Sequence, residues 1–257
     1  MKLERKQMAR YLTFVALLIV FAGCQNGLSM FGALGEVGQT TLPQNRLASV
    51  QVEQGQQEEQ VEDADSPLRN PALATEEAPA TFRVQVATTK GDFIIEVTRE
   101  WSPAGADRFY NMVQSGYFED IAIFRAIPGF MFQFGIHGDP EIGGPWSEAT
   151  IQDDRSFEGV SNLKGYITFA KTGAPNSRST QMFINLGNNA ALDRQGFTPF
   201  GRIVEGIEVA DKINTEYGEN PRGENVQGKF KAKGNAYIRE RFPNLDFIES
   251  ITLVDTP

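Results

Sequence analysis

The chain has 257 residues, a formal net charge of −9 and a pI near 4.8, with one cysteine and one histidine. This charge argues against a nucleic-acid-binding protein, which needs a basic surface. The single cysteine excludes a disulfide framework within the monomer and any cysteine-cluster metal site, and the single histidine argues against a serine–histidine–aspartate triad.

Residues 1–23 have the pattern of a signal peptide. Basic residues precede the apolar run Tyr11–Gly23, which is shorter than the roughly 20 residues that cross a bilayer. Phe21-Ala22-Gly23-Cys24 resembles a bacterial lipobox, although Phe21 departs from the usual aliphatic residue. This resemblance implies cleavage before Cys24 and a lipid anchor on that cysteine. An ordinary signal peptide, or an uncleaved anchor with an incidental cysteine, is the alternative.

We therefore expect an extracytoplasmic protein on the periplasmic side, lipid-anchored to a bacterial membrane through Cys24. Residues 24–81 then carry two arginines against nine acids and show no helical or strand periodicity. Such a segment buries too little apolar area to offset its ordering entropy, so we predict a disordered acidic linker extended by self-repulsion. A scaffolding lipoprotein that acts through this acidic tail is an alternative.

Residues 82–257 are predicted to form the folded domain. Alternating apolar residues predict a hairpin around Lys90-Gly91. Ser102-Pro103 predicts a helix start and Gly116 the end of that helix. Gly206–Ile213 is predicted as a second short helix. The remaining strands are predicted at Ile121–Ile127, Met131–Gly135, Gly165–Ala170, Gln181–Leu186, Phe200–Val204 and Phe247–Val254. The pattern alone leaves a β-sandwich and a β-barrel equally open.

The segment 124–135 is the most informative part of the chain. It contains Arg125, then the turn-forming pair Pro128-Gly129, then Phe-Met-x-Gln. In a strand, Phe130 and Phe132 would lie on one face, with Met131 and Gln133 on the other. Arginine and glutamine beside Phe and Met predict an apolar ligand pocket with few polar donors. A core hairpin with one arginine that reaches solvent is the alternative.

These residues carry a resemblance to a known family. Arg125-x-Ile-Pro-Gly-Phe-Met-x-Gln133 resembles the central motif of the cyclophilins, which are peptidyl-prolyl cis-trans isomerases. Phe169-Ala170 and Ser179–Ile184 resemble the family's next two motif segments, and Leu192-Asp193 with Phe200-Gly201 resembles the last, so that four segments follow the family's order. The resemblance covers roughly residue 82 to the C-terminus. It implies a mainly β fold, a closed eight-stranded antiparallel β-barrel capped by two α-helices, with a substrate groove on its outer wall.

The resemblance implies isomerisation of X-Pro bonds, here in exported proteins during folding. When the bond twists, the lone pair of the imide nitrogen localises, and a fixed donor aimed at it stabilises the transition state preferentially. Arg125 is the expected donor, because its guanidinium is always charged and planar. This chemistry requires no cofactor and no metal. A proline-peptide-binding or holdase module that keeps the groove without turnover is the alternative function.

The resemblance assigns Arg125, Phe130 and Gln133 to catalysis. It assigns substrate binding to seven further residues: Met131, Ala170, Lys171, Gln181, Phe183, Leu192 and Phe197. Lys171 stands where many relatives have asparagine, and Phe197 falls near the family's pocket histidine. Ala191 stands where many eukaryotic relatives have a tryptophan that contacts cyclosporin, so we expect weak cyclosporin binding.

Three features remain outside the motifs. His137 is expected to be a solvated loop histidine, and Asp153-Asp154 a turn, since the spaced ligands of a calcium loop are missing. Residues 219–242 form an insertion to which the sequence assigns no role. The expected partners are proline-containing polypeptides and the membrane, with no nucleic acid, and the protein is expected to be a monomer.

Overall fold

The computed structural model describes residues 65–219 and 225–255. The predicted signal peptide, Cys24 and the linker up to residue 64 lie outside the described residues. Within the described ranges, no helix combines the length and apolar character needed to cross a membrane.

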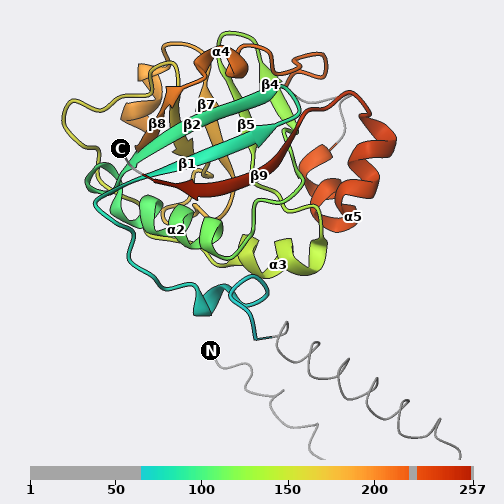
Figure 1. Cartoon of the computed structure of the whole chain (residues 1–257), viewed down its shortest axis with the longest axis horizontal. Helices are drawn as coiled ribbons and strands as arrows, with labels where there is room; N and C mark the ends of the chain where they lie inside the picture. Colours follow the sequence, from blue (N-terminus) through green and yellow to red (C-terminus); the bar gives the residue numbers. More distant parts are fainter. Residues whose placement is uncertain (1–64, 220–224, 256–257) are drawn as a thin grey trace, which may run out of the picture. The chain divides into compact units, whose positions relative to one another are not determined.

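Nine antiparallel strands form one curled sheet in the order β3-β9-β1-β2-β8-β6-β7-β5-β4. Figure 1 shows β9, β1 and β2 side by side across the front of the sheet. The strands are β1 Thr81–Thr88, β2 Gly91–Thr98, β3 Ile121–Ala122, β4 Arg125–Ile127, β5 Met131–Phe134, β6 Tyr166–Phe169, β7 Met182–Asn185, β8 Pro199–Glu205 and β9 Phe247–Val254. The prediction of a mainly β, antiparallel fold is confirmed.

The predicted closed, eight-stranded barrel is wrong in strand number and in closure. The two edge strands, β3 and β4, follow each other in the chain but pair with different partners, β9 and β5. The single strand predicted at Ile121–Ile127 is therefore broken at Ile123 and Phe124, where the backbone N–H of Ile123 donates to the Asp246 carbonyl at 2.9 Å. A continuous apolar run does not reveal such a change of partner.

The concave interior of the sheet is a packed aromatic and aliphatic core. Along β1, Val84 and Val86 are fully buried while the residues between them are not, as strand alternation requires. The ring of Phe109, from the helix that begins at Pro103, lies 5.5 Å from the Phe118 ring and 5.2 Å from the Phe200 ring. The interior is thus filled, and any ligand site must lie on the outer wall.

Four α-helices lie in the described part of the chain, where two were predicted: α2 Pro103–Gln114, α3 Pro140–Glu148, α4 Ile207–Ala210 and α5 Val226–Arg241. The predicted start of α2 is confirmed, with Ser102 as the N-cap residue and Pro103 following it. The helix α3 was missed because its interior contains two glycines and Pro145, all poor helix formers. The described residues also contain three short 3₁₀ turns: η1 Pro71–Leu73, η2 Arg99–Trp101 and η3 Ala190–Gln195.

The insertion 219–242 contains α5, which packs on the outside of the sheet beside β9 (Figure 1). Its apolar side chains join residues of the sheet in a second hydrophobic cluster, separate from the core inside the sheet: Ala122, Phe124, Ile136, Val226, Phe230, Tyr237, Ile238, Phe242, Leu245 and Phe247. A break at Gly234 hides the helical period from sequence reading, because the backbone there is non-helical, with φ of 65°. The insertion therefore has its own apolar anchorage.

A close backbone approach fixes this helix to the loop after β5. The Asn235 N–H donates to the Gly138 carbonyl at 2.9 Å, and a Cβ on Gly138 or Gly234 would overlap the other segment. The Asn235 side chain donates to the Asp120 carbonyl at 2.7 Å, and Arg239 pairs with the Asp120 carboxylate at 2.5 Å. Glycine at these two positions lets the backbones touch.

Residues 65–80, placed in the linker by sequence, pack against the domain. Trp146 donates its indole N–H to the Leu68 carbonyl at 2.7 Å, and the Ala78 N–H donates to Asp107 at 2.9 Å. The Asn111 side chain bonds to both the N–H and the carbonyl of Glu76. The folded part therefore begins before Phe82, since partners on α2 and α3 satisfy this backbone.

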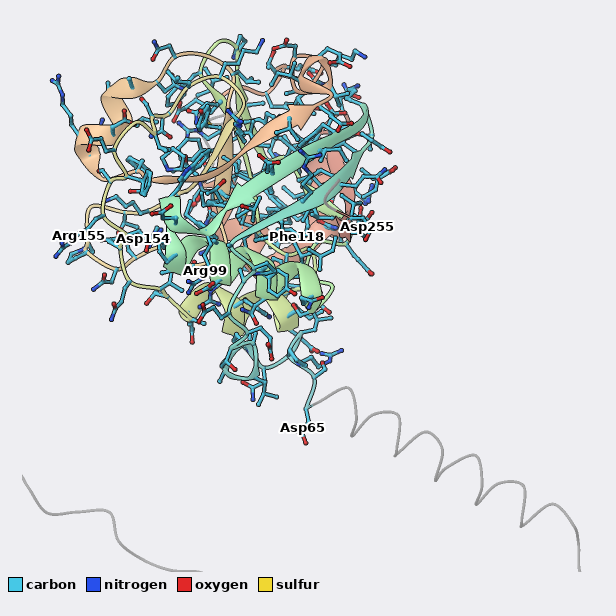
Figure 2. All side chains as sticks on the ribbon, turned by 60° about the vertical axis from the view of Figure 1, so that its left-hand side comes forward. Asp65, Arg99, Phe118, Asp154, Arg155 and Asp255 are labelled. Carbon is cyan, nitrogen blue, oxygen red and sulfur yellow. The ribbon has the colours of Figure 1, made fainter. Side chains whose placement is uncertain are left out.

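The expected turn at Asp153-Asp154 is absent, and Asp154 instead caps α2. Its carboxylate accepts hydrogen bonds from the N–H groups of Ala104 at 3.1 Å and Gly105 at 3.0 Å, and it pairs with Arg178 at 2.9 Å. In Figure 2, Asp154 lies on the loop that runs beside the start of this helix. A carboxylate is favourable there, because the first helical N–H groups lack partners and carry partial positive charge.

Candidate active site

A groove of about 450 Å³ lies on the outer wall of the sheet. All ten side chains that sequence analysis assigned to catalysis or substrate binding line it: Arg125, Phe130, Met131, Gln133, Ala170, Lys171, Gln181, Phe183, Leu192 and Phe197. They come from β4, the β4–β5 turn, β5, β7 and η3, and from the segments next to β6, β7 and η3. The curled sheet thus collects residues that lie up to 72 positions apart in the sequence.

A chain of hydrogen bonds orients the arginine. Arg125 and Gln133 are direct partners in the β4–β5 ladder, and Arg125 Nη1 donates to Gln133 Oε1 at 2.9 Å. Gln133 Nε2 donates in turn to Gln181 Oε1 at 2.9 Å. The Arg125 Nη2 group donates to Glu219 Oε1 at 2.6 Å. The guanidinium is held from two sides, which fixes the direction of its remaining N–H groups.

The apolar wall of the groove adjoins this arginine. Met131 and Phe183 are buried, and the Phe183 and Phe197 rings meet edge-on at 5.9 Å. The Phe130 ring centroid lies 5.9 Å from Arg125 Cζ. Together with Leu192 these side chains form an apolar pocket beside a fixed cation.

The predicted alternation along β5 holds only inside the strand. Met131 and Gln133 face the groove, whereas Phe132 belongs to the core inside the sheet. Phe130 was predicted on the same face as Phe132, but it lines the groove. It precedes β5, next to Gly129 with φ of 70°, so strand geometry does not apply to it.

A partly buried polar network behind the groove was missed by sequence reading. Asn189 donates to the Phe130 carbonyl at 2.7 Å and to the Asn185 side chain at 2.7 Å. Asn162 donates to Asp193 at 2.7 Å and to the Phe197 carbonyl at 2.8 Å. These bonds hold the backbone beside three groove residues, Phe130, Leu192 and Phe197. Asparagines scattered along the sequence carry no local signal for such a role.

Asp193 is the ionised centre of this network. Burial raises the pKa of its carboxyl group, but hydrogen bonds from Ser161 and Asn162 outweigh burial and leave that pKa below its usual value. Ser161 Oγ donates to the carboxylate at 2.5 Å, and the Asn162 N–H donates to it at 3.0 Å. The charged form is therefore the one that the fold stabilises.

The insertion also contributes to the groove. Gln227 and Lys231 of α5 line it, together with Ser147 of α3 and with Thr172, Ser177 and Ser179 of the β6–β7 connection. None of these six was predicted, because their elements were either unassigned or read as loops. Among the described residues, no group of three or more His, Cys, Asp or Glu side chains has the arrangement of a metal site.

The expected solvated position of His137 is wrong. Its side chain is buried, with the ring centroid 5.0 Å from that of Tyr117. Its Nδ1 accepts the Asp139 N–H at 3.0 Å, and burial lowers the pKa of the imidazole. Burial likewise raises the pKa of the Tyr117 hydroxyl, which donates to the Gly135 carbonyl. The histidine was misplaced because α5 and α3, which help to enclose it, were not predicted.

Comparison with known proteins assigns the chain to a family. The family model described as "Cyclophilin type peptidyl-prolyl cis-trans isomerase/CLD" matches residues 83–233. The chain belongs to the cyclophilin family.

Several peptidyl-prolyl cis-trans isomerases are similar to it. Peptidyl-prolyl cis-trans isomerase A of Dickeya dadantii is 32% identical over 155 residues, which cover 59% of this chain and 79% of that protein. A peptidyl-prolyl cis-trans isomerase of Acinetobacter baylyi is 30% identical, with 55% of this chain and 76% of that protein covered. This cyclophilin is thus an enzyme of the peptidyl-prolyl isomerase class.

Solved structures agree on the fold. A cyclophilin type peptidyl-prolyl cis-trans isomerase of Cryptosporidium parvum superposes with a TM-score of 0.51 at 18% identity, over 69% of this chain and 99% of that chain. A second structure of the same protein, in the presence of the dipeptide Ala-Pro, gives 0.50 at 20% identity, over 68% and 99%.

Proposed function

We propose that this cyclophilin isomerises X-Pro bonds in exported proteins and that Arg125 stabilises the twisted imide. The observation that carries the proposal is the Arg125–Gln133 hydrogen bond at the edge of the apolar pocket. A cation held in one orientation beside apolar walls fits a substrate that offers a proline ring and a transient lone-pair acceptor. The solved relative with Ala-Pro supports a proline-containing ligand for this fold.

The energetics are compatible with one fixed donor in a dry pocket. The barrier to X-Pro rotation is about 18–20 kcal/mol. An acceleration of about a thousand- to a million-fold requires about 4–8 kcal/mol of transition-state stabilisation. Preorganised charged donors contribute several kcal/mol, and exclusion of water by Phe130, Phe183 and Phe197 strengthens each electrostatic contact.

The cellular setting is the second part of the proposal. The lipobox-like Phe21-Ala22-Gly23-Cys24 supports a lipid-anchored, periplasm-facing enzyme that acts on polypeptides emerging from export. Incorporation of labelled fatty acid in cells that express the full chain tests this. We expect label in the wild type and none in Cys24→Ser. Equal label in both would remove the anchor from the proposal and leave the enzymatic part intact.

Isomerisation of a short X-Pro peptide by the full-length chain tests the enzymatic part. We expect rapid turnover by the wild type. Arg125→Ala should lower kcat/KM by at least about tenfold, because it removes the donor, and should leave the circular dichroism unchanged. Arg125→Lys should stay impaired, since lysine cannot reproduce the planar fork. A wild type that binds proline peptides but is no faster than buffer would favour the binding module instead.

A further inference from the structure

The charged residues that line the groove are all cations. Arg125, Lys171 and Lys231 line it, and no Asp or Glu among the described residues does so. This stands out in a chain whose formal net charge is −9. The sign of the local charge is therefore opposite to that of the whole chain.

Two of these cations have no counter-ion in the described part of the chain. Arg125 pairs with Glu219, whose side chain is 66% exposed. Neither Lys171 nor Lys231 lies within ion-pair distance of a described carboxylate. Lys171 Nζ instead lies 5.5 Å from the centroid of the Phe197 ring, on the wall of the apolar pocket. Their charges are thus available to a bound peptide.

The fold fixes where Lys231 stands. Val226 and Phe230 are buried in the second apolar cluster, which anchors α5. Gln227 and Lys231, each one position further along, are four residues apart and so lie on one face of the helix, where both line the groove. Lys231 and Ser147 also line a smaller hollow next to His137, which places this lysine beside α3.

We infer that the groove selects proline-containing peptides with an acidic residue close to the X-Pro bond, and that Lys231 is a specificity-determining residue for them. This inference rests on the proposed isomerase function and names its substrate class. The net negative chain repels acidic peptides at long range, so the discrimination comes from the local, unpaired lysines. An exposed pair of this kind changes affinity by about two- to fivefold and weakens with salt.

The test measures isomerisation by NMR exchange, with the full-length chain and peptides built around one Ala-Pro bond. Glu, Gln or Lys is placed in turn at each of the positions one to three residues before and after that bond. The proteins are the wild type, Lys231→Glu and the matched control Lys233→Glu. Both variants reverse one charge on α5, but Lys233 does not line the groove and contacts the Tyr237 ring. Long-range effects of charge therefore cancel in the comparison.

At one or more positions we expect wild-type kcat/KM to be about two- to fivefold higher for Glu than for Gln, mainly through KM, and lowest for Lys. Lys231→Glu should abolish or invert this order, Lys233→Glu should keep it, and 0.5 M NaCl should weaken it. Equal rates for Glu and Gln peptides, or the same loss in both variants, would overturn the inference while the isomerase function stands. Absence of turnover of every peptide, including the neutral ones, would overturn the function and the inference together.

Discussion

Arg125 Nη2 donates to Glu219 Oε1 at 2.6 Å, so the first residue of the insertion touches the arginine of the groove. The opposite nitrogen, Nη1, is held by Gln133 at 2.9 Å. Two acceptors from segments 86 positions apart therefore fix one guanidinium. The exposure of Glu219 means that solvent screens its charge, so its main effect is on the orientation of the arginine.

We predict that Glu219→Ala lowers kcat/KM by about two- to fivefold, the range for an exposed ion pair, with little change in the free energy of unfolding. Glu219→Gln should stay near wild type, because an amide oxygen can still accept from Nη2. Peptide turnover at low salt gives the measurement. A faster Glu219→Ala enzyme would show instead that this carboxylate competes with the substrate for Arg125.

The buried His137 predicts a pH dependence of stability. Its folded-state pKa lies below the ordinary value of 6.5. At a pH between these two pKa values the unfolded chain binds the proton more readily than the folded chain does. The stabilisation is fully present above about pH 6.5 and is lost as the pH falls from there to the folded-state pKa.

Denaturant unfolding between pH 8 and pH 5 measures this loss. His137→Asn keeps an acceptor for the Asp139 N–H, and we expect a flatter profile than that of the wild type below pH 6.5. The carboxylates contribute equally to both proteins at lower pH, so the difference between the two curves isolates the histidine. Parallel curves would contradict a neutral buried imidazole.

The cap of α2 predicts that alanine substitutions of two adjacent aspartates lower the free energy of unfolding by very different amounts. Asp154→Ala removes the acceptor of two helical N–H groups and leaves Arg178, only 3% exposed, without its closest carboxylate. We expect a loss of about 3–5 kcal/mol in the free energy of unfolding. Asp153, 30% exposed and 3.6 Å from Arg178, is the control, for which Asp153→Ala should cost about 1 kcal/mol or less. Similar losses in both variants would show that Asp154 is not the cap.

Docking of α5 predicts a strong effect of a single methyl group. Gly234→Ala places a Cβ against the Gly138 carbonyl and forces alanine to φ of 65°, so we expect a loss of about 2 kcal/mol or more. Hydrogen exchange of the α5 amides should accelerate, because the helix separates from the loop after β5.

Gly144→Ala is the matched control for this change. Gly144 lies in α3, has no neighbouring atom within 4 Å of its Cβ position and, unlike Gly234, does not have a positive φ. Gly144→Ala should leave the free energy of unfolding and the hydrogen exchange of the α5 amides unchanged. Unchanged protection of the α5 amides from hydrogen exchange in Gly234→Ala would contradict the prediction, since it would show that α5 stays docked without the close approach of the two backbones.

The sequence by itself determined the antiparallel strands, the start of α2 and all ten predicted groove residues. Strand alternation and a Ser-Pro helix start are local signals, and they survive folding because each depends on neighbouring residues only. The groove residues follow instead from the family resemblance that the motif segments carry. The weak cyclosporin binding expected from Ala191 stays a prediction, as do the lipid on Cys24 and the place of the enzyme in the cell.

Only the tertiary structure decided the open, nine-stranded sheet, the burial of His137, the cap from Asp154 and the role of the insertion. Each depends on contacts between segments far apart in the chain, such as Gly138 with Asn235 or Arg125 with Glu219. Burial and pairing energies arise from the environment that folding creates, and residue type and spacing do not specify that environment. The third cation of the groove is such a property, because Lys231 joins Arg125 and Lys171 only where α5 lies beside residues of the sheet.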